Sequence, residues 1–174
     1  MKKNLFYHFL VAFLVASIWL LFANKECEYN HDFLAINGFN WFTWLAWGLG
    51  LFFVYILYLL VVNKIKPKNF IQKFLIFLII YWPFLILAET VGYYTFNIHN
   101  IAAANYPGLP ICHCMHAPLW MQIGYFSLGP IYFLICYLLK LENNSKKRLI
   151  NNLSFLRKST LQSAFICFYW TKSN

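Results

Sequence analysis

The chain has 174 residues, of which 61% are hydrophobic, 22% aromatic and only 11% charged, and its formal net charge is +9. Soluble domains carry roughly 25% charged and 45–50% apolar residues, so this composition excludes a water-facing globular surface. The abundance of hydrophobic and aromatic residues also excludes intrinsic disorder. The composition therefore predicts a small multi-pass membrane protein.

Four apolar stretches are long enough to cross a bilayer as helices, since about 20 residues at 1.5 Å per residue span a hydrocarbon core of roughly 30 Å. They cover residues 5–23, 41–62, 70–93 and 117–139. The first resembles a signal peptide, but its apolar run is longer than usual, so we expect an uncleaved helix. The predicted fold is an all-α, four-helix transmembrane bundle over residues 1–140, with a long outer loop between the third and fourth helices.

The basic residues lie on one side of this predicted bundle. All lysines and arginines except Lys25 flank the start of the first span, the turn between spans two and three, or the end of span four. Such residues are retained on the cytoplasmic side, so the sequence predicts both termini in the cytoplasm. We expect an integral protein of the bacterial plasma (inner) membrane.

The same basic residues indicate which partners to expect. Lysine and arginine beside a bilayer attract anionic lipid, by about 1 kcal/mol per residue close to the surface. Binding to nucleic acid is not expected, because it needs a folded, water-exposed basic surface rather than residues that flank membrane spans. The predicted partners are therefore the bilayer and the anionic lipid at its cytoplasmic face.

Residues 141–174 are predicted to form a cytoplasmic tail that contains a basic amphipathic helix. Basic residues at 146–148 precede apolar residues at helical spacing, namely Leu149, Ile150, Leu153 and Leu156. This pattern is typical of a helix that lies in the membrane interface.

Aromatic and small residues in the spans suggest how the helices are anchored and packed. Trp41, Trp44 and Trp47 recur every three residues, which favours an aromatic anchor in the headgroup region over a ligand-binding stack. Four glycines in spans two and four are expected to allow close helix approach: Gly48, Gly50, Gly124 and Gly129.

Two prolines lie inside predicted spans, Pro83 in the third and Pro130 in the fourth. Each removes an amide donor and leaves the carbonyl four residues earlier without its helical partner, at Ile79 and Phe126. We therefore expect a kink in both helices.

Most polar residues suited to chemistry lie between Glu89 and Gln122. If span three begins near residue 74, Glu89 lies roughly 6 Å inside the hydrocarbon, where a carboxylate is costly unless it is paired, protonated or hydrated. If the span begins at Phe70, Glu89 is an ordinary helix-end residue among the headgroups. Only the first alternative makes Glu89 a candidate functional group.

A polar stripe is expected beyond Glu89. A helix continued past that residue places Tyr93, Asn97 and Asn100 on one face. Gln122 in span four is predicted at a similar depth, and a hydrogen bond between Gln122 and Glu89 is the resulting hypothesis.

Residues 112–116 read Cys-His-Cys-Met-His, which places five potential metal ligands in succession. Thiolate, thioether and imidazole are soft ligands that suit Cu(I), and Zn accepts the cysteine and histidine members. The predicted metal ligands are Cys112, His113, Cys114 and His116, with His99 as an additional donor.

Two other interpretations of this segment stay open. Cys27 is also predicted on the outer, disulfide-permitting side, so it can pair with Cys112 or Cys114. Alternatively, the segment is only the entry to the fourth helix, with Pro118 in its first turn, where the missing amide is harmless.

Several familiar enzyme classes are excluded by the residues present. Asp32 is the only aspartate, which rules out an Asp-pair peptidase, and no nucleotide-binding or serine-hydrolase motif occurs. Four spans, the size and the orientation resemble the quinone-linked thiol oxidases of the bacterial disulfide pathway. Those enzymes carry a Cys-x2-Cys pair after the first span, where this chain has only Cys27, so the resemblance is one of topology.

The leading functional prediction is an outer-leaflet pocket that binds or transforms a small amphiphile such as a lipid or quinone. The candidate catalytic residues are Glu89, His99 and His116, with Glu89 and one histidine as the acid/base pair. The candidate substrate-binding residues are Tyr93, Asn97 and Gln122. Two alternatives are a non-catalytic subunit or assembly factor of a membrane complex with a Cu or Zn site, and a purely structural membrane protein.

Overall fold

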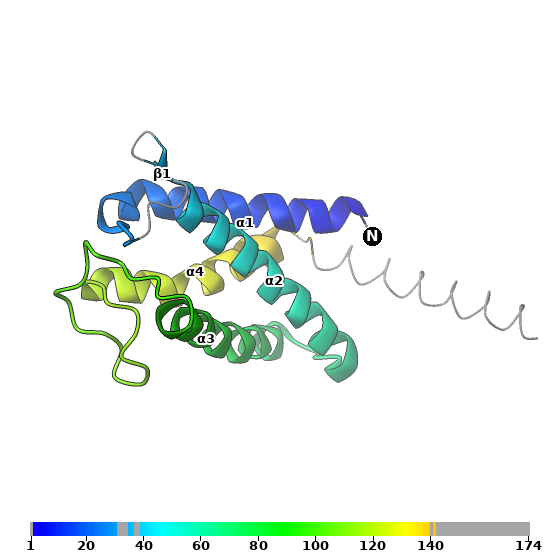
Figure 1. Ribbon diagram of the computed structural model, residues 1–174. Helices are drawn as coiled ribbons and strands as arrows, with labels where there is room; N and C mark the ends of the chain where they lie inside the picture. Colours follow the sequence, from blue (N-terminus) through cyan, green and yellow to red (C-terminus); the bar gives the residue numbers. More distant parts are fainter. Residues whose placement is uncertain (1, 31–34, 37–38, 140, 142–174) are drawn as a thin grey trace, which may run out of the picture.

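The computed structural model describes residues 2–30, 35–36, 39–139 and 141 (Figure 1). Within that part of the chain four helices are long and apolar enough to cross a membrane: α1 (Lys2–Ala23), α2 (Trp41–Ile65), α3 (Phe70–Tyr94) and α4 (Leu119–Leu138). The predicted all-helical fold with four spans is thereby confirmed. The predicted tail helix lies outside the described residues.

The bundle has two different ends. We call the end formed by residues 24–40 and 95–118 the loop end, and the opposite end, with the α2–α3 connection, the turn end (Figure 1). The loop end carries η1 (Asn24–Glu26) and a short antiparallel pair, β1 (Ala35–Ile36) and β2 (Phe39–Asn40). Among the basic residues that the structure describes, only Lys25 lies at the loop end.

Two asparagines fix the starts of the central helices. The Asn40 side chain accepts a hydrogen bond from the Thr43 amide at the start of α2, and Asn69 does the same for Gln72 at the start of α3. Such capping satisfies amides that have no partner within the helix. Each cap therefore fixes where its helix begins.

Three glycines receive an aromatic ring from a neighbouring helix. A Cβ added at Gly48 would lie 2.7 Å from the Phe13 ring, and one added at Gly124 would lie 2.3 Å from the Trp19 ring. At Gly129 the Tyr81 ring would be 2.5 Å away. The predicted close approach is correct at these three positions, where packing without side-chain volume brings helices together.

Pro83 and Pro130 lie inside α3 and α4, and the second one has a partner helix that compensates for it. The Trp82 indole of α3 donates to the Phe126 carbonyl at 3.2 Å, which is the carbonyl that Pro130 leaves without its helical amide. The Tyr81 hydroxyl donates to the adjacent Tyr125 carbonyl. The α3–α4 contact is therefore both closely packed and hydrogen-bonded.

A buried polar group also joins helices α1, α2 and α4. His8 is fully buried, its ring stacks on Tyr55 at 3.9 Å between centroids, and its Nδ1 lies 3.3 Å from Cys136 Sγ. The Tyr132 hydroxyl donates to the His8 carbonyl at 3.2 Å. Polar contacts between helices of this kind supplement packing in an apolar environment.

Candidate functional site

Several of the predicted site residues meet around one hollow at the loop end. Glu89, Tyr93, His99 and His116 all line a cavity of about 90 Å³, which we call the polar cavity. Its other lining residues are Tyr29, Ile98, Asn100, Ala104, Met115 and Tyr125. The chain thus gathers groups from α3 and from both loop-end connections, although they lie up to 87 positions apart in the sequence.

Tyr93 occupies the centre of this group of side chains. Its ring lies edge-on to the His99 ring at 4.1 Å between centroids and stacks on the His116 ring at 5.6 Å. Tyr93 follows Glu89 by one helical turn, so both lie on the same face of α3 and line the same cavity. The predicted pairing of Glu89 with a histidine is not a hydrogen bond here; the residues share only the cavity wall.

The two histidines differ in what their ring nitrogens face. His116 Nδ1 lies 2.7 Å from the Tyr106 carbonyl oxygen, and its Nε2 lies 3.2 Å from the His113 carbonyl oxygen. His99 Nε2 lies 2.6 Å from Asn97 Oδ1. Within the described part of the chain, Nδ1 of His99 is the one ring nitrogen of this pair with no hydrogen-bond partner.

The polar stripe predicted along α3 does not form. Helix α3 ends at Tyr94, and Asn97 has a left-handed backbone with φ 53°, so Asn97 and Asn100 belong to the following connection. An exposed Asn97 side chain contacts His99 and positions its ring instead of facing the cavity. The helical extrapolation was wrong because α3 ends before it reaches Asn97.

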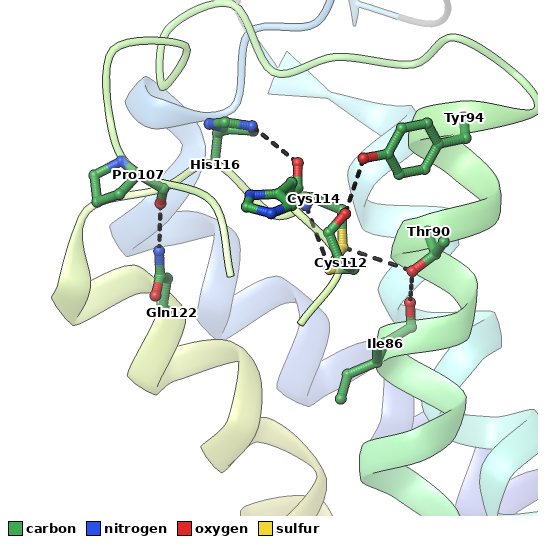
Figure 2. Close-up of a disulfide and its surroundings, with 9 residues drawn as sticks. Ile86, Thr90, Tyr94, Pro107, Cys112, Cys114, His116 and Gln122 are labelled. Carbon is green, nitrogen blue, oxygen red and sulfur yellow. Dashed lines mark hydrogen bonds between the residues drawn. A yellow bond between two sulfur atoms is a disulfide. The ribbon is translucent and has the colours of Figure 1, made fainter. Parts of the chain in front are cut away.

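Gln122 has a different role from the one predicted. Its amide donates to the Pro107 carbonyl at 3.0 Å (Figure 2). It also donates to the Ala117 carbonyl at 3.0 Å and lines neither cavity described here. The hypothesised hydrogen bond to Glu89 is therefore not formed. Gln122 attaches the long connection to the start of α4.

The first connection supplies residues that the sequence did not single out. Tyr29 forms a β-bridge with Asn100, and the Asn30 side chain exchanges hydrogen bonds with the Asn97 carbonyl and the His99 amide, both at 2.8 Å. Burial, together with the nearby Cys27 and Glu89, raises the pKa of Tyr29 well above its usual value. The Tyr29 hydroxyl therefore stays protonated beside Glu89. No periodic pattern marks Tyr29, so only the fold reveals it.

A second cavity of about 180 Å³ adjoins the first between α2 and α3, and we call it the apolar cavity. Tyr29, Glu89, Tyr93 and Ile98 line both cavities. Trp47 also lines the apolar cavity; it is buried and stacks on Tyr125 at 5.1 Å between ring centroids. The prediction of an interfacial anchor was therefore wrong for Trp47.

The apolar cavity is bounded by small residues at helical spacing. Ala46 and Gly50 lie one turn apart on α2, and Ala88 and Gly92 lie one turn apart on α3. A Cβ added at Gly50 or Gly92 would meet nothing within 4 Å, and both alanines are exposed. The predicted close approach is thus wrong for Gly50, because its missing side chain contributes open space.

The cysteines of the long connection are joined to each other. Cys112 and Cys114 form a disulfide, whereas Cys27 lies buried in the core outside this bond. The Cys114 sulfur lies 3.7 Å from the Thr90 hydroxyl, and the Tyr94 hydroxyl donates to the Cys112 carbonyl at 2.9 Å (Figure 2). The disulfide therefore fastens the connection to α3, and the pairing with Cys27 that we considered is not formed.

The residues predicted as metal ligands are not arranged around one point. The two sulfurs are joined in the disulfide, His113 is exposed, and both nitrogens of His116 face carbonyl oxygens. Among the described residues no group of three or more His, Cys, Asp or Glu is placed to hold a metal ion. Instead, the residues that follow the disulfide, Met115 and His116, lie in the wall of the polar cavity.

The Glu89 carboxylate is the central polar group of the whole site. It lies where the two cavities meet, and no described residue gives it a hydrogen bond or an opposite charge. Helix α3 begins at Phe70, the start for which the sequence places Glu89 among the headgroups, so depth in the membrane does not mark this residue. Its candidacy rests instead on its place in the lining of both cavities, where a carboxylate without a partner is energetically costly. Comparison with protein-family models, with curated proteins and with solved structures gives no match to this chain.

Proposed function

We propose that this chain is a multi-pass integral membrane protein that binds a small amphiphile, such as a lipid or a quinone, at Glu89. In this proposal both termini lie in the cytoplasm of a bacterium and the loop end faces outward. The position of the described basic residues at the turn end supports this orientation. Exposed Lys64, Lys66 and Lys68 would then contact anionic lipid at the cytoplasmic face.

The observation that carries the proposal is the position of Glu89 between a polar cavity and an apolar one. Ligand sites combine a mostly apolar wall with a few convergent polar groups. An amphiphile has the same division, so its polar end would face Glu89 and its apolar end would occupy the space between α2 and α3.

The small residues on α2 and α3 offer a route for the apolar part. Ala46 and Ala88 are exposed on the outside of the bundle and also line the apolar cavity. Short side chains at this position leave a gap toward the surrounding lipid, through which an alkyl chain can extend. Access from the bilayer requires no opening of the loop end.

If the site transforms its ligand, His99 is the better candidate than His116 to exchange a proton with it. The Nδ1 of His99 has no partner among the described residues, whereas both nitrogens of His116 are directed at carbonyl oxygens. In that case Glu89 would act as the second acid/base group, and Tyr93 would align the two.

The test is to fill the apolar cavity without disturbing the packed helices. Photocrosslinking of the purified protein with a long-chain alcohol that carries a diazirine should label residues 42–54 of α2 and 81–93 of α3. In the variants Gly50→Leu and Gly92→Leu, we expect labelling to fall by about tenfold, since each leucine displaces two or more methylene groups of the ligand at about 0.8 kcal/mol each.

The matched control is Leu49→Phe, which enlarges an exposed side chain next to Gly50 but outside the cavity. This variant should be labelled as strongly as the unmodified chain. Equal labelling of the two cavity-filling variants and the control, with melting temperatures unchanged, would overturn the proposed site.

A further inference from the structure

Apart from the imidazoles of His99 and His116 in the polar cavity, the formal charge in the lining of the two cavities is of one sign. Glu89 is the only lysine, arginine, aspartate or glutamate among all the residues that line either cavity. No described residue gives its carboxylate a hydrogen bond or an ion pair. A ligand that carries a positive charge would supply the missing partner, whereas an anionic ligand would meet a like charge.

Aromatic rings line the same cavity as the carboxylate. Six aromatic residues line the apolar cavity along with Glu89, namely Tyr29, Phe42, Trp47, Tyr81, Phe84 and Tyr93. The face of an aromatic ring is electrically negative, and rings arranged around a hollow bind quaternary ammonium groups in many recognition sites. The rings and the carboxylate therefore favour the same kind of ligand.

One of the three tyrosine hydroxyls in this lining is already engaged. The Tyr81 hydroxyl donates to the Tyr125 carbonyl, so its proton is not available to an electron-rich ligand atom. Neutral ligands with carbonyl oxygens, such as quinones, need donors directed at those oxygens. Tyr81 therefore adds nothing for a neutral acceptor, whereas its ring remains part of the lining that favours a cation.

We propose that the polar end of the ligand is an organic cation, an alkylammonium group held between the Glu89 carboxylate and the aromatic rings of the apolar cavity. This inference rests on the proposed function, because it names the chemical class of the amphiphile bound at the same site. The alkyl chain extends out of the cavity past Ala46 and Ala88, two exposed lining residues with small side chains.

The experiment is a competition against the photoreactive alcohol in neutral maltoside detergent. Dodecyltrimethylammonium and dodecanol share one alkyl chain and differ in the charge of the polar end. For the unmodified chain, dodecyltrimethylammonium should halve labelling at a concentration about tenfold lower than dodecanol, as expected for a desolvated cation beside aromatic rings. In Glu89→Gln the two competitors should act at equal concentrations.

Two further variants separate the local effect from general attraction of a cation. Glu28→Gln removes an exposed carboxylate at the loop end and should keep the tenfold preference. Phe84→Leu removes one ring of the cavity and should reduce the preference for dodecyltrimethylammonium over dodecanol by about threefold.

The outcomes distinguish this inference from the proposed function. Equal competition by both amphiphiles in the unmodified chain overturns the cation and leaves the amphiphile site in place. Absence of competition by either overturns the proposed function itself. Tetramethylammonium, which has no long alkyl chain, tests whether the chain contributes to binding. If it competes as strongly as dodecyltrimethylammonium, the site binds a cation but not an amphiphile, and the proposed function is overturned. Much weaker competition supports both the cationic head and the alkyl chain.

Discussion

The α3–α4 contact and the α2–α3 contact use glycine in opposite ways. At α3–α4, Gly129 receives the Tyr81 ring, and the neighbouring Trp82 indole donates to a carbonyl of α4. At α2–α3, Gly50 and Gly92 have nothing within 4 Å of an added Cβ, and residues of both helices line a cavity of about 180 Å³. Glycine therefore allows close packing at the α3–α4 contact and borders a cavity at the α2–α3 contact.

The difference lies in the residue that faces the glycine. Tyr81 is large enough to fill the space that Gly129 leaves, and its hydroxyl finds a carbonyl acceptor across the contact. At the apolar cavity no atom lies within 4 Å of an added Cβ at Gly50 or Gly92, so the space that these glycines leave is unfilled. Small residues at helical spacing therefore indicate either close packing or a hollow, and the partner helix determines which.

The largest expected effect concerns the closely packed α3–α4 contact. Gly129→Leu drives side-chain atoms into the Tyr81 ring, whose atoms would lie 2.5 Å from the new Cβ. We expect the free energy of unfolding to fall by about 3 kcal/mol, the upper end of the cost of overpacking a core. Unfolding by sodium dodecyl sulfate in mixed micelles measures it.

Gly50→Leu is the matched control for that substitution, because its new side chain enters open space. Its free energy of unfolding should stay within about 0.5 kcal/mol of the unmodified chain or rise, since leucine favours helix more than glycine does. Equal destabilisation by both substitutions would show that the two interfaces do not differ.

The next effect concerns Glu89, which lines the apolar cavity between α2 and α3. Glu89→Leu should raise the free energy of unfolding by about 2 kcal/mol, because it removes a charged group that no described residue compensates. The same variant should lose its preference for dodecyltrimethylammonium over dodecanol. A binding group that reduces stability is expected where function requires an unpaired charge.

For this prediction the control is Glu28→Leu, which changes an exposed carboxylate and should leave stability within about 0.5 kcal/mol. A loss of stability in Glu89→Leu would mean that the carboxylate has a stabilising partner in the unliganded protein. That result would remove the physical basis of the cation site.

The smallest effect concerns the connection between α3 and α4, which contributes Met115 and His116 to the wall of the polar cavity. The double variant Cys112→Ser/Cys114→Ser removes a cross-link that closes a very short loop, which chain entropy values at about 1.5 kcal/mol. Hydrogen exchange should accelerate at the amides of Leu109 and His113, which are hydrogen-bonded within residues 109–114. The helices should keep their protection.

A thiol reductant added to the unmodified chain should reproduce that acceleration and should have no effect on the double variant. If exchange at Leu109 and His113 is the same with and without the disulfide, hydrogen bonds alone hold the connection. The position of Met115 and His116 in the cavity wall would then not depend on the bond.

The sequence predicted part of the site correctly because some residues carry their own physical signal. Glu89 stands out as an ionisable group near the end of an apolar stretch, and His99 and His116 are rare imidazoles in the connections. All three line the polar cavity, together with Tyr93. Asn97 was extrapolated from helical spacing, but it lies beyond the end of α3. Gln122 was predicted from its depth in the fourth span, but its side chain contacts loop carbonyls instead of Glu89.

Hydrophobicity and length by themselves determined the four helices, because an apolar stretch of about 20 residues in lipid must satisfy its backbone hydrogen bonds internally. The distribution of basic residues likewise predicts the orientation without any tertiary information. Tertiary structure decided which glycines close an interface, which cysteines pair and which aromatic rings face Glu89. Each of those outcomes depends on contacts between residues far apart in the chain, and no local pattern encodes the residue that lies opposite.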